Sequence, residues 1–159
     1  MNREKQQEYA ARISQANRTE LLVIVYEILE EEIHLAEQAF QEREFQTFDQ
    51  ELQTALQFLQ ELMGTLNFEY EISGQLLSLY RFINKVLIED RMKKQPEYLA
   101  ECAKIVADLR KAYEEVARQD HSGSLMVNTQ KLYAGLTYGK HSLEEVSMDE
   151  KSGSRGYYA

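Results

Sequence analysis

Residues 58–92, FLQELMGTLNFEYEISGQLLSLYRFINKVLIEDRM, decide the fold of this chain. They contain one helix end, a tight junction at Met63-Gly64-Thr65, and then about seven turns of a second helix. One apolar row of that second helix recurs at steps of three and four: Phe68, Ile72, Leu76, Leu79, Ile83 and Val86. A second row lies beside it: Tyr70, Leu77, Tyr80 and Leu87. Two rows predict a helix packed on both sides by its own bundle, or a helix that also offers a face to a partner.

The composition favours long helices in one compact domain. The chain has 159 residues, 43% of them apolar, with one proline and seven glycines, six of which lie at or after Gly74. No run of 18 apolar residues is long enough to cross a membrane, and the polar N-terminus argues against a secretory leader. The net charge of −9 argues against a nucleic-acid partner. Cys102 is the one cysteine, which excludes a disulfide framework and fits a reducing cytoplasm.

The pattern divides the chain into an arm (1–16), a four-helix bundle (17–119), and a linker with a flexible tail (120–159). Asn17 and Glu20 have the spacing of a capping box, so a helix is predicted to begin there. The four bundle helices are predicted at about 18–41, about 47–65, the long stretch ending among Arg91 to Lys94, and about 96–118, with Pro96 in the first turn of the last.

Three segments carry apolar residues beyond a single core stripe. The turns from Leu21 to Tyr26 are apolar all the way round, which implies a second apolar contact. In the arm, Tyr9 and Ile13 lie four residues apart, so a short helix could dock on a groove or simply fray. The cluster from Tyr133 to Tyr138 either packs on the bundle or forms a binding motif, and packing is favoured.

No catalytic constellation is present. A di-iron bundle needs Glu-x-x-His on two helices and two further glutamates, and the one match is Glu31-Glu32-Ile33-His34. Cys102 has no nearby histidine, and no glycine-rich phosphate loop occurs. The sequence therefore predicts a protein that is not an enzyme and needs neither cofactor nor metal.

The residues at the helix junction resemble the FliS family of flagellin export chaperones. The resemblance rests on residues 59–72, followed by Leu76, Leu79-Tyr80 and Asn84, which are similar to a family segment of the form LMxTLDxExEIxxNLxxLYxYxNxxL. Tyr9, Glu20-Leu21-Leu22 and Val25-Tyr26-Glu27 are similar to the family's N-terminal tyrosine and first-helix motif, so the resemblance covers roughly residues 9–118. The chain departs from the family at Asn17-Arg18 (Ser-Pro), Glu27-Ile28 (Asp-Gly) and Gln75 (Asn).

The resemblance implies an all-α, antiparallel four-helix bundle in the cytoplasm without a cofactor. Such a chaperone binds the disordered C-terminal segment of flagellin, prevents premature polymerisation and delivers the subunit to the flagellar export apparatus, including its gate components. We expect the arm to cover the binding groove in the free protein. The predicted partner-binding residues are Tyr9, Ile13, Val25, Tyr26, Leu29, Tyr70, Leu76, Tyr80, Ile83 and Leu87. Two alternatives stay open: a bundle that only self-associates as a homodimer or adaptor, and a metal-dependent bundle enzyme.

Overall fold

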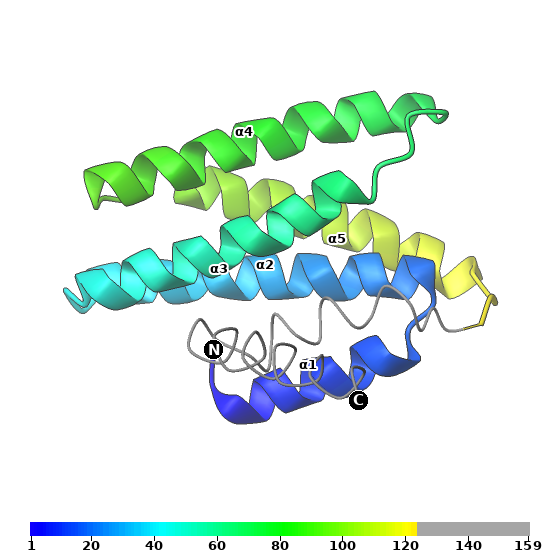
Figure 1. The fold of residues 1–159 in the computed structure, drawn as a ribbon, viewed down its shortest axis with the longest axis horizontal. Helices are drawn as coiled ribbons and strands as arrows, with labels where there is room; N and C mark the ends of the chain where they lie inside the picture. Colours follow the sequence, from blue (N-terminus) through cyan, green and yellow to red (C-terminus); the bar gives the residue numbers. More distant parts are fainter. Residues whose placement is uncertain (124–159) are drawn as a thin grey trace, which may run out of the picture. The chain divides into compact units, whose positions relative to one another are not determined.

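The computed structural model describes residues 1–123, and every regular element in that range is an α-helix. Consecutive bundle helices are joined by short loops and run in alternate directions (Figure 1), as the sequence predicts for an antiparallel four-helix bundle. These helices are α2 (Arg18–Gln41), α3 (Phe45–Gly64), α4 (Glu71–Lys93) and α5 (Leu99–Gln119). Helix α1 (Arg3–Gln15) belongs to a separate compact unit, and its helical form agrees with the expectation for the arm. The predicted tail cluster lies outside the described residues.

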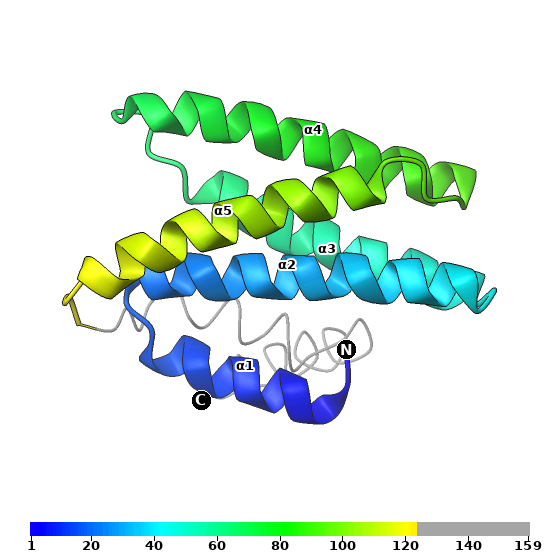
Figure 2. The ribbon, with the colours of Figure 1, turned by 180° about the vertical axis from the view of Figure 1, so that it is seen from behind.

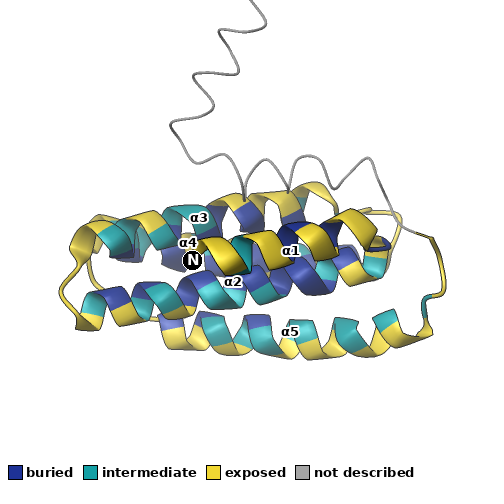
Figure 3. Ribbon diagram, turned by 90° about the horizontal axis from the view of Figure 1, so that it is seen from below, coloured by how far each residue is buried: buried dark blue, intermediate teal, exposed yellow. Residues whose placement is uncertain are grey.

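Helix α2 supplies the largest share of the buried core. Its first turn carries the predicted capping box, because the Glu20 amide donates to Asn17 Oδ1 and the Asn17 amide donates to Glu20 Oε2, each at 2.9 Å. Nearly every residue from Leu21 to Leu29 is buried, and α2 packs against both α3 and α5 (Figure 3). The all-round apolar turns are therefore explained by two neighbouring helices.

The loop before α4 is longer than predicted. We expected the long helix to start directly after the junction at Thr65, but α4 begins at Glu71. Asn67 explains the delay: its side-chain oxygen accepts from the Glu69 amide at 3.0 Å, and its carbonyl accepts from the Tyr70 amide and the Ser73 hydroxyl. A side chain that accepts a hydrogen bond from the backbone amide two residues later stabilises a turn instead of a helix.

The start of α5 also differs from the prediction. Pro96 lies before the helix and not in its first turn, since α5 begins at Leu99. Lys94 ends α4 in a left-handed conformation with φ of 52°, and the buried Asp90 carboxylate accepts from the Glu97 amide at 3.1 Å. The turn from α4 into α5 is therefore held by Asp90 and the left-handed Lys94, and Pro96 follows two residues after this C-cap, where it cannot continue the helix.

Candidate functional site

An exposed apolar surface lies on one flank of α4. Ile72, Leu79 and Phe82, here called the α4 ridge, are 55%, 36% and 43% exposed. Their spacing of seven and three residues keeps them on neighbouring positions of one helix face. They lie beside the row that faces the core, so α4 carries more apolar surface than its own bundle covers.

The ridge continues the surface that α4 buries against α5. Ile72 and Leu79 lie 18 and 11 residues before Asp90, which puts all three within about 20° of one another around the helix axis. At the Asp90 end, Ile83 and Val86 are buried near the turn into α5. At the Ile72 end the same side of the helix is exposed.

The divergence of α5 explains this difference. Helices α4 and α5 lie close together at the turn that joins them. They move apart toward the N-terminus of α4 (Figure 2). Along α5, Leu99, Cys102 and Val106 are buried, whereas Val116, near the other end, is 52% exposed. In the described part of the chain, the N-terminal part of α4 and the C-terminal part of α5 therefore keep exposed apolar residues.

The loop leading into α4 extends the exposed apolar surface. Phe68 and Tyr70 are 64% and 65% exposed, and both lie in the turn held by Asn67. Large aromatic side chains with this exposure are frequent anchors in protein–protein interfaces. We therefore group Phe68 and Tyr70 with the ridge as one candidate binding surface.

A tyrosine cluster joins three helices inside the bundle. The hydroxyls of Tyr26 (α2) and Tyr80 (α4) are hydrogen-bonded to each other, and both side chains are fully buried. Tyr113 of α5 lies against Tyr26, with ring centroids 5.6 Å apart. Burial raises the pKa of Tyr80 to about 12 and that of Tyr26 further, so both phenols stay neutral at physiological pH.

The structure places most of the predicted partner-binding residues in the interior. Seven of them are buried in the bundle: Val25, Tyr26, Leu29, Leu76, Tyr80, Ile83 and Leu87. Tyr70 is exposed, whereas Tyr9 and Ile13 of α1 are 8% and 0% exposed. A partner would reach the buried seven only if the helices separated, so their role in binding stays a prediction. The ridge residues Ile72, Leu79 and Phe82 were missed because helical spacing does not tell the covered flank of a wide apolar face from the open one.

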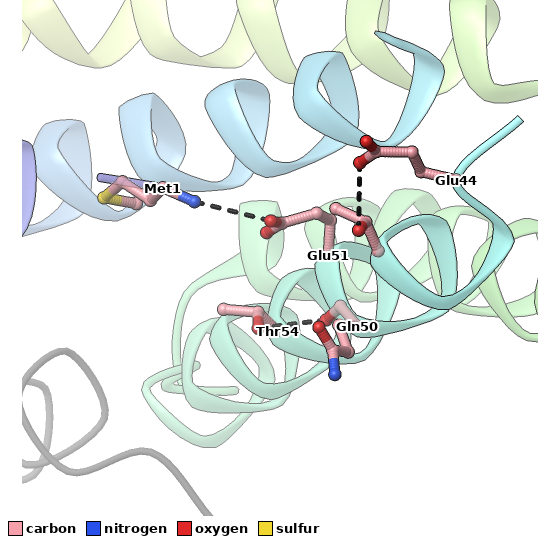
Figure 4. Close-up of polar contacts among 6 residues, drawn as sticks. Met1, Glu44, Gln50, Glu51 and Thr54 are labelled. Carbon is pink, nitrogen blue, oxygen red and sulfur yellow. Dashed lines mark hydrogen bonds and ion pairs between the residues drawn. The ribbon is translucent and has the colours of Figure 1, made fainter. Parts of the chain in front are cut away.

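A buried carboxyl pair links α2 to α3. Glu32 is 1% exposed and hydrogen-bonded to Glu51, which also accepts from the Met1 ammonium at 3.4 Å (Figure 4). Desolvation, together with the neighbouring Glu51, raises the pKa of Glu32 to about 9, so the pair holds a proton at neutral pH. The single Glu-x-x-His match includes Glu31, but no group of three or more potential metal ligands occurs among residues 1–123.

Comparison with known proteins identifies the family. A model described as "Flagellar protein FliS" matches residues 1–120. The flagellar secretion chaperone FliS of Bacillus subtilis (strain 168) is 29% identical over 115 residues, which cover 70% of this chain and 86% of that protein. No helix within residues 1–123 has both the length and the apolar character needed to cross a bilayer. Because the family match spans well over half of the chain, the protein belongs to the FliS family of flagellar export chaperones.

Proposed function

We propose that this protein binds the disordered C-terminal segment of flagellin in the cytoplasm, prevents its premature polymerisation and delivers it to the flagellar export apparatus. The family membership supports the class of client. The observation that carries the proposal is the α4 ridge, an apolar row left exposed where α4 and α5 diverge.

The ridge suits a client that folds as it binds. Amphipathic helices make contacts through apolar side chains spaced at three, four and seven residues, and Ile72, Leu79 and Phe82 follow one another at steps of seven and three. Ordering a disordered segment opposes binding by a few kcal/mol, so the client must bury a wide apolar surface. Phe68 and Tyr70, next to the first turn of α4, supply further aromatic area.

Calorimetric titration with a peptide of roughly the last forty residues of the host's flagellin tests the proposal, as this length covers a segment able to bury 1,000 Å² or more. We expect one-to-one binding with a negative heat-capacity change. The double variant Leu79→Ser with Phe82→Ser should bind at least about tenfold more weakly, because it removes two of the three large apolar side chains of the α4 ridge.

Phe45→Ser provides the matched control, since Phe45 is a large apolar residue of similar exposure (49%) at the start of α3. It should bind like the unmodified protein. Equal loss in the control and the ridge variant would exclude the ridge as the specific contact. An absence of binding by the unmodified, folded protein would exclude flagellin as the client.

The shielding role of the arm is a separate part of the hypothesis. Removing residues 1–16 should raise the affinity for the flagellin peptide or increase aggregation of the free protein. If neither quantity changes, residues 1–16 do not cover the client surface.

A further inference from the structure

A second exposed surface lies on the opposite side of α4 from the core. Arg81, Lys85, Ile88 and Met92, here called the outer stripe, follow one another at steps of four, three and four residues, so they share one helix face. Lys85 lies about 160° around the helix from the buried Ile83. The outer stripe thus points away from the bundle and is distinct from the α4 ridge.

The stripe combines accessible apolar and cationic groups. Ile88 and Met92 are 40% and 80% exposed. The Lys85 side chain is 71% exposed and makes only a 3.8 Å contact with Glu89, a type of pair that contributes little to stability. Arg81 is exposed and forms no ion pair with any of residues 1–123.

The local charge is opposite to that of the chain as a whole. From Arg81 to Lys94 there are five cationic residues and two acidic ones, whereas the whole chain carries a net charge of −9. Arg91 and Lys93 form ion pairs with Asp49 and Glu97, so Arg81 and Lys85 supply the positive charge of the outer stripe. By contrast, α2 carries six glutamates and one arginine. A cationic, partly apolar stripe on an acidic protein attracts an acidic partner only in one orientation, because the rest of the surface repels it.

From these observations we infer that the outer stripe docks an acidic, amphipathic protein segment, separately from the client surface. Two apolar side chains of the partner, one helical turn apart, would cover Ile88 and Met92, and flanking carboxylates would pair with Arg81 and Lys85. A protein segment fits better than an anionic bilayer, because the outer stripe has only two exposed apolar side chains, fewer than the broad apolar face that an interfacial helix inserts. The net charge of −9 opposes approach to such a bilayer. This inference does not depend on flagellin being the client.

The test uses two synthetic helical peptides with the same apolar positions, one with acidic and one with basic residues elsewhere. Fluorescence anisotropy with the full chain should show binding of the acidic peptide, and its affinity should fall several-fold between about 50 and 200 mM salt. The charge-reversal variant Arg81→Glu with Lys85→Glu should bind at least about tenfold more weakly, as two charge pairs become repulsive.

Lys104→Glu with Lys111→Glu is the control, because both lysines are exposed on α5 and the change in net charge is the same. Met92→Ser tests the apolar part without a charge change and should also weaken binding. Both outer-stripe variants should keep their affinity for the flagellin peptide, which separates this surface from the α4 ridge.

Three outcomes would overturn the inference. Equal binding of the acidic and basic peptides would remove the role of charge. An equal loss in the Lys104/Lys111 control would make the effect one of net charge alone. Sedimentation of the protein with equimolar phosphatidylglycerol and phosphatidylcholine vesicles, lost with Arg81→Glu and Lys85→Glu and without acidic-peptide binding, would assign the stripe to a membrane surface instead.

Discussion

Helices α2 and α4 both carry more apolar residues than one core stripe requires, but the bundle treats them differently. In α2 the surplus is buried between α3 and α5, and the remaining face is acidic. In α4 it is buried at one end only, and the helix keeps an apolar ridge on one flank and a cationic stripe on its outer side. In this chain, surplus apolar residues therefore form an exposed candidate binding surface only where the neighbouring helix diverges.

The largest expected effect is a loss of stability when one buried side chain in α2 or in α4 is truncated, compared with truncation of one ridge residue. Leu29→Ala in α2 and Ile83→Ala in the covered half of α4 should each lower the free energy of unfolding by about 2–5 kcal/mol, because both side chains are fully buried. Leu79→Ala in the ridge, where 36% of the residue is exposed, should lower it by less than about 1 kcal/mol. Urea denaturation measures all three, and a loss at Leu79 equal to that at Ile83 would mean that the ridge is core.

An intermediate effect is expected at the carboxyl pair of α2. The pKa of Glu32 is raised from 4.5 to about 9 by burial, so the folded state keeps a proton that the unfolded chain releases. This contribution to stability is complete below about pH 4.5 and is lost as the pH rises toward 9. Glu32→Gln keeps a donor for Glu51 and cannot ionise, so it should stabilise the protein by about 1–3 kcal/mol at pH 8 and have little effect near pH 5.

Unfolding free energies at both pH values test this, with Glu37→Gln, a half-buried site on the same helix, as the control. A gain of the same size at pH 5, or in the control variant, would show that the proton on Glu32 is not the cause.

The smallest effect is expected where α2 begins and α5 ends. The Ser122 hydroxyl donates to the Asp120 carboxylate, as do the Thr19 hydroxyl at 2.6 Å and the Ser122 amide; these hydrogen bonds lower the pKa of Asp120 to about 2. Its contribution is therefore present above about pH 4 and is lost as the pH falls toward 2. Asp120→Asn should lower Tm slightly at pH 6, by about 1–3 °C, and the difference should vanish near pH 2. Thermal melts in which the variant and the unmodified protein differ equally at both pH values would assign the effect to something other than the charge.

The sequence by itself determined the helical class, the family and the local signals. Asn17 and Glu20 form the predicted capping box, and α2 has the predicted bounds Arg18–Gln41, because such signals act within one helical turn. The segments quoted from residues 59 to 84 also pointed to the family whose model matches residues 1–120. The predicted starts of α4 and α5 were wrong, because side chains bind nearby backbone amides there. Asn67 accepts from the Glu69 amide, and Asp90 accepts from the Glu97 amide.

The tertiary structure alone decided which apolar residues are covered. Ile72, Leu79 and Ile83 share one apolar row in the sequence, yet Ile83 is buried and the other two are exposed. The difference arises from the path of α5, which is anchored near Asp90 and diverges from α4 along its length. Helical periodicity records the direction in which a side chain points but not the distance to the next helix, so the position of the candidate surface required the packed bundle.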